Sequence, residues 1–242
     1  MMWDTLFRVA ASPLLIAQAL RVRRIAQSLP EATGPRSGVT GNGPALRLAI
    51  IGDSSAAGVG AATQDQALAG QTVAALSQDF TVHWHLDALT GATTKSTLTR
   101  LRATPPRPAD VAIIALGVND VTRLVPAQTW VDQQEALLQL VKTTYGVTQF
   151  YLSAMPPLHA FPLLPEPLRW TLGRHAQKLE AARLAHLATR TDCTHVPFDL
   201  PNDPSLMASD GFHPSEALYA LWGAEMGQRI KAAWPDSTSP KP

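Results

Sequence analysis

The chain has 242 residues, of which 45% are hydrophobic and 16% charged, so it can form one large α/β domain or two small ones around a sizeable core. The formal net charge of +1 gives no strong electrostatic field, and no nucleic-acid partner is expected. The single cysteine, Cys193, excludes an intrachain disulfide and a cysteine-based zinc site.

The N-terminal residues 2–29 carry apolar side chains at roughly helical spacing, and a basic cluster follows them. The basic residues come after the apolar part, which argues against a signal peptide. Arg8 and Pro13 interrupt the apolar run, so it is too short to span a bilayer. We favour a helix docked on the protein's own surface. The alternative is an interfacial helix, so peripheral membrane contact of a cytoplasmic protein stays open. The basic cluster consists of Arg21, Arg23 and Arg24.

Residues 30–45 are rich in Pro, Gly, Ser and Thr and contain few large apolar side chains. This composition predicts a linker or an exposed loop. We therefore divide the chain into an N-terminal helix and linker over 1–45, a main domain over 46–234 and a flexible tail over 235–242.

Strand-like and helix-like segments alternate through the main domain. Short apolar or alternating runs predict strands at 46–51, 81–86, 111–116, 147–153 and 194–198. Apolar residues at helical spacing predict helices at 64–77, 96–103, 130–145, 169–190 and 214–233. We expect Thr129 to cap the third of these helices and Pro214 to lie in the first turn of the last one. The alternation predicts a parallel sheet with helices on both faces.

The first strand leads directly into Gly52-Asp53-Ser54, a sequence that fits a tight turn from a sheet into a helix. Ser54 would stand at the carboxyl end of the strand, where open α/β sheets bind their ligands. Free N–H groups at a nearby helix N-terminus would favour negative charge there. We hypothesise that Ser54 is a nucleophile, and the alternative is an ordinary turn with a serine cap.

Two further blocks follow the next two strands. Gly91 comes after the second strand, and a glycine can bring its bare N–H close to a ligand. Gly117-Val118-Asn119-Asp120 comes after the third strand, and an Asn amide there is a neutral donor suited to a developing oxyanion. Each block read alone is also compatible with a plain turn.

A last block, Asp210-Gly211-Phe212-His213-Pro214, precedes the final predicted helix. In a tight turn Asp210 could reach the imidazole of His213. The carboxylate would then fix the ring's tautomer, and the ring would take a proton from a serine and return it to a leaving group. A solvated loop is the alternative for this block alone.

The four blocks occur together in this order, and in this the chain resembles the SGNH hydrolases, also called GDSL esterases and lipases, over about residues 46–234. The resemblance implies a flavodoxin-like three-layer α/β/α sandwich with a central parallel sheet of about five strands. It also implies that Ser54 is the nucleophile, His213 the base and Asp210 the partner of that base. The oxyanion donors would be the Ser54 N–H, the Gly91 N–H and the Asn119 side chain.

The chain departs from many members of the family after Gly-Asp-Ser, where they carry a bulky residue. Here the small residues Ser55, Ala56 and Ala57 follow, which leave room beside the serine without identifying a substrate. Asp120 also matches the family block, and we expect it to brace the Asn119 loop rather than to do chemistry.

The reaction expected from the resemblance is hydrolysis of a small-molecule or lipid ester through an acyl-enzyme, with no cofactor. An acyltransferase or thioesterase using the same site is an alternative, as is a non-catalytic module that binds acyl or glycan ligands. The oligomeric state, the acyl-chain length and the natural ester stay open.

The segment from Met155 to Trp170 is crowded with prolines, which excludes a regular helix or a central strand. We propose it as an apolar wall for an acyl chain, and a loop packed on the core is the equally weighted alternative. Its candidate substrate-binding residues are Leu158, Phe161, Leu163 and Leu164. His83 and His85 share one face of a predicted strand, but no third ligand is evident, so no metal is expected.

Overall fold

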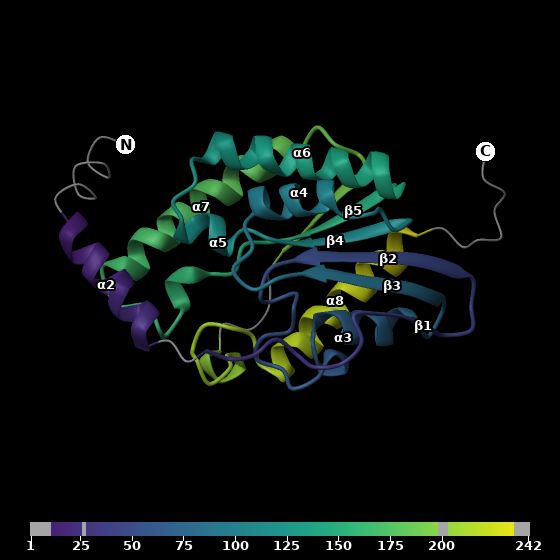
Figure 1. Cartoon of the computed structure of the whole chain (residues 1–242), viewed down its shortest axis with the longest axis horizontal. Helices are drawn as coiled ribbons and strands as arrows, with labels where there is room; N and C mark the ends of the chain where they lie inside the picture. The colour runs from purple at the N-terminus through teal and green to yellow at the C-terminus, as the bar shows by residue number, and fades with distance from the viewer. Residues whose placement is uncertain (1–10, 26–27, 198–202, 235–242) are drawn as a thin grey trace.

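A computed structural model describes residues 11–25, 28–197 and 203–234. Its centre is a six-stranded sheet with the strand order β1-β3-β2-β4-β5-β6, covered by helices on both faces (Figure 1). The strands are β1 (Ser37–Thr40), β2 (Ala45–Gly52), β3 (Thr81–Ala88), β4 (Val111–Ala115), β5 (Gln149–Ser153) and β6 (Cys193–Val196). Strands β2 to β6 run parallel to one another. Strand β1 lies at the edge of the sheet and pairs antiparallel with β3. The α/β class and the parallel sheet expected from the alternating pattern are confirmed.

Strand β2 lies in the middle of the sheet and pairs with both β3 and β4. Its consecutive residues Ile50 and Ile51 are fully buried and belong to different core clusters, one on each face. A strand covered on both faces needs a continuous apolar run, which is what residues 48–51 supply. The central position of β2 places its carboxyl end, and the residues that follow, in the middle of one edge of the sheet.

The helices divide between the two faces. Helices α3 (Leu68–Leu76) and α8 (Glu216–Ala233) pack together on one face, and α4 (Thr94–Ala103) and α6 (Ala127–Tyr145) cover the other (Figure 1). Helix α7 (Leu168–Leu187) packs beside α6. A third apolar cluster lies between α6, α7 and the proline-rich segment. Short helical turns complete the chain: η1 (Gln64–Gln66), α5 (Val118–Thr122), η2 (Leu158–Ala160) and η3 (Pro204–Leu206).

The linker expected over residues 30–45 is wrong in part, because this stretch contains an edge strand and closes onto the main domain. Strand β1 pairs with β3 and so covers an edge that would otherwise expose unpaired backbone groups. Just before it, the Ala32 N–H donates to the Ala57 carbonyl at 3.3 Å and the Thr33 N–H to the Ala62 carbonyl at 3.1 Å. The N-terminal boundary placed at residue 46 therefore separates segments that pack as one structure.

Helix α2 (Ser12–Ile25) is docked on the surface of the domain. Its inner side chains pack against the third apolar cluster. The Gln18 side chain donates to the Glu166 carbonyl at 2.6 Å and accepts from the Leu168 N–H at 3.1 Å, which ties α2 to the start of α7. The inner apolar residues are Leu15, Ala19 and Val22. Residues 2–10 of the expected helix and the tail over 235–242 lie outside the described residues.

Two expected helix starts are wrong. Helix α6 begins at Ala127 after Pro126, so Thr129 lies inside the helix rather than at its cap. Helix α8 begins at Glu216 with Ser215 as its cap, and Pro214 precedes the helix. The Ser215 hydroxyl accepts from the Leu218 N–H, the bond that a capping serine provides. In the described part of the chain, no helix is long and apolar enough to cross a membrane.

Candidate active site

Ser54 follows the carboxyl end of β2 in a tight turn. The Asp53 N–H donates to the Ala115 carbonyl at 3.1 Å, and the Ala57 N–H donates to the Asp53 carbonyl at 2.9 Å. Only glycine fits at position 52, because a Cβ there would lie 2.3 Å from Ala56 Cβ. Within the described residues the Ser54 N–H donates to no acceptor. The turn therefore presents both a hydroxyl and an unused N–H at the edge of the sheet.

His213 and Asp210 meet Ser54 from a loop that precedes α8. The His213 Nε2 lies 2.9 Å from the Ser54 hydroxyl oxygen, and the His213 Nδ1 lies 2.5 Å from Asp210 Oδ2. For the Ser54 hydroxyl to donate to Nε2, the ring proton has to sit on Nδ1, where it is donated to the carboxylate. Residues far apart in the chain thus form a continuous hydroxyl–imidazole–carboxylate relay.

The second oxygen of Asp210 fixes the carboxylate in place. Asp210 Oδ1 accepts the N–H groups of Phe212 at 2.9 Å and His213 at 3.0 Å. Burial alone would raise the pKa of Asp210, but the hydrogen bonds from the His213 ring and from these two N–H groups lower it further than burial raises it. Asp210 is therefore a carboxylate at neutral pH.

Asn119 lies in the first turn of α5, directly after β4. Its side-chain amide donates to the Ala92 carbonyl at 3.0 Å and approaches Asp53 Oδ2 at 3.4 Å. Gly117 brings the chain into this turn with a φ of +145°, and a Cβ there would lie 2.6 Å from the Met155 methyl carbon. Asn119 also lines the same cavity as Ser54 and His213.

Asp120 points away from the cavity into a buried hydrogen-bond network. Its carboxylate accepts the Thr94 N–H and the Thr94 hydroxyl, both at 3.0 Å. The Thr94 hydroxyl oxygen in turn accepts from the Trp130 ring at 3.1 Å and from the Gln134 amide at 3.0 Å. Burial raises the pKa of Asp120, and the Thr94 bonds oppose that rise. This network ties α5 to the start of α4 and to α6.

Gly91 lies at the third position of a turn between β3 and α4. The Ala92 N–H donates to the Leu89 carbonyl at 3.1 Å, and Gly91 has a φ of +77°. Within the described residues the Gly91 N–H donates to no acceptor. Because Asn119 holds the neighbouring Ala92 carbonyl, the turn lies next to the Asn119 amide.

Asp53 is a buried acid between Ser54 and Asn119. Its Oδ1 accepts from the Ser55 N–H at 3.0 Å and from the Ser55 hydroxyl at 2.8 Å. Burial raises the pKa of Asp53 to about 6, although the Ser55 bonds and the nearby His213 lower it in part. The sequence analysis placed Asp53 only in the turn before Ser54 and gave it no role, because nothing in the pattern indicates its burial.

A largely apolar cavity opens beside the Ser54 hydroxyl. Of the expected substrate-binding residues, Phe161 alone lines it. Leu158 and Leu164 are buried in the third core cluster, and Leu163 lies outside the cavity wall. The sequence analysis did not single out the other apolar side chains of the cavity lining, among which are Leu116, Val118, Met155, Leu206, Met207 and Phe212. They come from loops and short helical turns that lie far apart in the sequence.

The two histidines of β3 differ in their surroundings. His85 is buried and its ring lies 5.9 Å from the Tyr145 ring, whereas His83 is exposed. Among the residues that the structure describes, no three His, Cys, Asp or Glu side chains are grouped so that they could hold a metal ion.

Comparison with known proteins places these features in context. The model of the GDSL-like lipase/acylhydrolase family matches residues 50–221. The GDSL-like esterase Rv1075c of Mycobacterium tuberculosis is 27% identical over 238 residues, which cover 88% of this chain and 74% of that protein.

Two solved structures show a similar fold. The psychrotrophic esterase EstA from Pseudoalteromonas sp., solved with the inhibitor monoethylphosphonate, has a TM-score of 0.59 and 19% identity over 77% of this chain and 97% of its own. A carbohydrate esterase of family 2 from Corynascus thermopiles has a TM-score of 0.61 and 20% identity over 80% of this chain and 68% of its own.

Proposed function

This chain belongs to the GDSL-like lipase/acylhydrolase family, and on that premise we propose that it is a serine esterase that hydrolyses carboxylic esters through an acyl-enzyme. The observation that carries the proposal is the relay from the Ser54 hydroxyl through the His213 ring to Asp210, with heavy-atom distances of 2.9 Å and 2.5 Å. Both distances allow direct proton transfer or hydrogen bonding without rearrangement.

In the acylation step the Ser54 oxygen attacks the ester carbonyl carbon while its proton passes to His213 Nε2. The carbonyl oxygen becomes an oxyanion, and we assign three neutral donors to it. These are the N–H groups of Ser54 and Gly91 and the side-chain amide of Asn119. The Asn119 amide would exchange its long 3.4 Å contact with Asp53 Oδ2 for the oxyanion and keep its bond to Ala92. The imidazolium then gives its proton to the leaving alkoxide as the C–O bond breaks, and an alcohol departs.

In the deacylation step water replaces the alcohol. His213 Nε2 takes a proton from this water, which attacks the carbonyl carbon of the acyl-enzyme. The same donors hold the second oxyanion, and the proton returns to the Ser54 oxygen as the carboxylic acid leaves. We expect Asp210 to remain ionised throughout, because its Oδ1 accepts two backbone N–H groups, which favour the charged form.

The shape of the cavity supports an apolar acyl group. Its lining includes the large apolar side chains of Met155, Phe161, Met207 and Phe212. Phe161 and Phe212 stack edge to face with ring centroids 5.1 Å apart, which gives the wall a fixed surface. The related proteins are described as an esterase, a carbohydrate esterase and a GDSL-like esterase, so ester cleavage is the chemistry that they share.

The proposal is tested with a series of nitrophenyl esters of increasing acyl length and with a fluorophosphonate probe. We expect ester hydrolysis by the wild type, its near-complete loss in Ser54→Ala, and a covalent phosphonate on Ser54 located by mass spectrometry. Wild-type turnover in Ser54→Ala would overturn the mechanism. Absence of label on folded protein would instead favour a binding module, and transfer of the acyl group to added alcohols or preference for thioesters would favour the alternative enzymes.

A further inference from the structure

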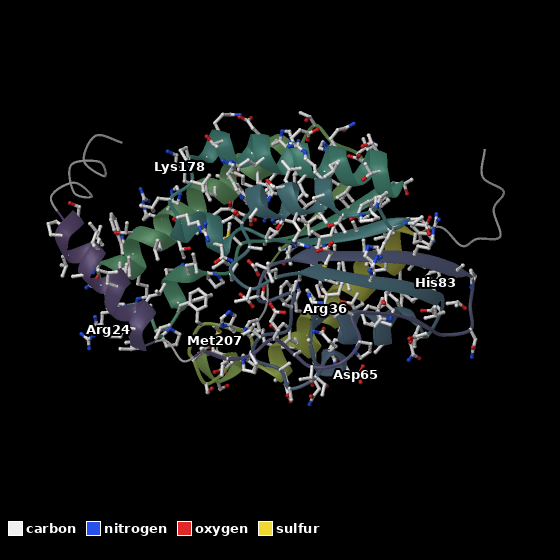
Figure 2. All side chains as sticks on the ribbon, in the orientation of Figure 1. Arg24, Arg36, Asp65, His83, Lys178 and Met207 are labelled. Atoms are coloured by element: carbon white, nitrogen blue, oxygen red, sulfur yellow. The ribbon has the colours of Figure 1, made fainter. Side chains whose placement is uncertain are left out.

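A carboxylate from the N-terminal segment holds the turn that carries Gly91. Glu31 Oε1 accepts the Thr90 N–H at 2.8 Å and the Thr90 hydroxyl at 2.7 Å. Its other oxygen accepts from Arg36 Nη1 at 2.9 Å, and Arg36 also donates to the Ala88 carbonyl at the end of β3. Figure 2 shows Arg36 near the middle of the molecule, not at the outer end of the sheet where His83 lies.

The Gly91 N–H depends on such support, because it belongs to the central peptide of its turn. The hydrogen bond that closes the turn joins Leu89 and Ala92 and leaves this central peptide without a bond inside the turn. The central peptide can reverse by rotation about the two bonds beside it. Glycine resists that rotation less than any other residue, because it has no Cβ.

The neighbouring groups are held from two sides. After Gly91, the Asn119 amide holds the Ala92 carbonyl, and Arg123 Nη2 lies 3.5 Å from the Gly91 carbonyl. Before Gly91, Thr90 is held by Glu31 through both its backbone and its side chain. Burial raises the pKa of Glu31, but the bonds from Thr90 and Arg36 lower it by more, so Glu31 is ionised at neutral pH. An ionised acceptor makes the stronger type of hydrogen bond.

We propose that Glu31 is a positioning residue that aims the Gly91 N–H at the oxyanion, an inference that rests on the proposed esterase function. The segment that the sequence predicts to be a linker would then be part of the catalytic apparatus. Glu31 contacts neither the substrate nor the reacting atoms and acts only through the Thr90–Gly91 peptide.

Steady-state kinetics of Glu31→Ala and Glu31→Gln test this inference with a nitrophenyl ester. Removal of an oxyanion donor costs about a hundred- to a thousand-fold in kcat, so misplacement of one should cost about ten-fold. We expect this loss in Glu31→Ala with KM within about two-fold of the wild type. Glu31→Gln should recover most of the rate, because its carbonyl oxygen can still accept from Thr90.

A trifluoromethyl ketone separates positioning from general destabilisation, because its adduct with serine places an oxyanion among the donors. We expect its inhibition constant to rise in Glu31→Ala by the same factor as kcat falls. The matched control is Asp110→Ala. Like Glu31, the Asp110 carboxylate accepts hydrogen bonds from a backbone N–H and from an arginine side chain, both of them from Arg47. Asp110 precedes β4, however, so it lies at the end of the sheet opposite to Ser54 and Gly91. This control should lower the melting temperature and leave kcat and inhibition unchanged.

Wild-type kcat and inhibition in Glu31→Ala would overturn the inference, as would an equal loss of kcat in the Asp110 control. If Glu31→Ala does not fold, Thr90→Val serves instead, because it removes one of the two hydrogen bonds that Thr90 donates to Glu31. It should lower kcat and weaken inhibition by a smaller factor, and unchanged values would count against the role of Glu31. A wild type that neither hydrolyses esters nor reacts with the fluorophosphonate would refute the proposed function itself.

A separate observation concerns the outer face of α2. Its inner face is already occupied by the third apolar cluster, yet four large aliphatic side chains on the helix are more than half exposed. They are Leu14, Ile16, Leu20 and Ile25. The exposed Arg21 and Arg24 lie among them, and the helix carries no Asp or Glu. Figure 2 shows Arg24 extending from α2 away from the rest of the molecule.

We infer that this outer face docks on a bilayer that contains anionic lipid. Aliphatic side chains between arginines, without acidic residues, are the pattern of helices that lie in the headgroup region. The opposite side of α2 packs in the cluster that also contains Phe161, Met207 and Phe212 of the cavity wall. Docking would therefore bring the cavity close to a source of lipid esters.

Sedimentation with vesicles tests this second inference on the full chain. We expect binding to phosphatidylcholine vesicles with about 30% phosphatidylglycerol, much weaker binding to pure phosphatidylcholine, and weakening by salt. Arg21→Glu with Arg24→Glu should weaken binding at least about ten-fold, and Ile16→Ser with Leu20→Ser should do the same. Two double variants serve as matched controls, because they change exposed side chains on other helices. They are Leu184→Ser with Leu221→Ser, for the aliphatic residues, and Lys95→Glu with Arg102→Glu, for the arginines. Both should bind vesicles like the wild type.

Hydrolysis of a short soluble ester should stay unchanged in all these variants, which reports that the fold is intact. Two results would overturn the inference: no difference between anionic and neutral vesicles, or equal loss in the matched controls. A dimer in light scattering that Ile16→Ser with Leu20→Ser dissociates, without vesicle binding, would assign the face to a second copy of the chain instead.

Discussion

The side-chain amide of Asn119 donates to the carbonyl oxygen of Ala92 at 3.0 Å. This bond joins the helix after β4 to the turn after β3, so two of the proposed oxyanion donors, Asn119 and Gly91, are fixed to each other. The Asp120–Thr94 bonds join the same two segments from the buried side. If these groups are the oxyanion donors, as we propose, they are preorganised before a substrate arrives, which is the condition under which such donors lower the barrier most.

Asn119→Ala should fold and lose about a hundred- to a thousand-fold in kcat, with little change in KM, because the amide is needed mainly in the transition state. The loss is measured with a nitrophenyl ester, and the fold is checked by circular dichroism and thermal melting. Thr122→Ala is the matched control on the same helix. It removes one exposed hydroxyl bond, to the Asn119 carbonyl, and should keep its rate. A rate in Asn119→Ala within about five-fold of the wild type would contradict the assigned role.

Asp210→Asn should reduce kcat severely, by about 10⁴-fold, because an amide group facing Nδ1 favours the wrong tautomer of His213. With the proton on Nε2 the ring can no longer accept from the Ser54 hydroxyl. The backbone bonds to Oδ1 can survive in the variant, so KM and the melting temperature should change little. The measurement is kcat against pH, and a loss of less than about ten-fold would mean that another group orients the ring.

The sequence was sufficient for the elements that local patterns encode. The apolar run of β2 and the glycine that ends it locate Ser54 at the sheet edge, and a short Asp-x-x-His spacing suffices to bring Asp210 and His213 together. The order of the strands in the sheet is not encoded locally. This order places β2 between β3 and β4. As a result, Ser54, Gly91 and Asn119, which follow these three strands, lie at the same edge of the sheet.

What the sequence did not reveal depends on burial and on distant contacts. Residues 30–45 have the composition of a linker, yet Glu31 and β1 find partners in β3 and in the turn after it. Leu158 and Leu164 have the same apolar character as Phe161, and nothing in the pattern says which of them faces the core. A proline-rich segment has no periodicity from which the facing of its side chains could be derived.

The raised pKa of Asp53 gives a prediction about stability. The ordinary value in the unfolded chain is 3.8 and the folded value is about 6. Between these values the folded state holds a proton that the unfolded state has released, so this group makes the protein less stable as pH rises from about 4 to 6. Asp53→Asn removes the titration and keeps an oxygen that can accept from Ser55.

Urea unfolding of the wild type and Asp53→Asn from pH 4 to 6.5 measures this effect. The free energy of unfolding of the wild type should fall relative to that of the variant by about 2–3 kcal/mol across the range. Asp132→Asn, an exposed carboxylate on α6, is the control and should run parallel to the wild type. A pH-independent difference between wild type and Asp53→Asn would show that Asp53 does not titrate in this window.

The different positions of Phe161 and Leu158 in one segment allow its two roles to be separated. Phe161 lines the cavity, and its ring meets Phe212 edge to face. Leu158 is fully buried in the core beneath it. Phe161→Ala should open the wall and shift the ratio of kcat/KM between long and short acyl esters about ten-fold toward the long ones, since pocket contacts of this size carry such discrimination.

Leu158→Ala should leave that ratio unchanged and instead lower the free energy of unfolding by about 2–5 kcal/mol, the usual cost of a cavity in a packed core. The esters are assayed below the melting temperatures of both variants, so that loss of folded protein does not enter the ratio. An equal shift of the ratio in both variants would mean that the segment moves as one body. An unchanged ratio in Phe161→Ala would place the acyl chain against another wall of the cavity.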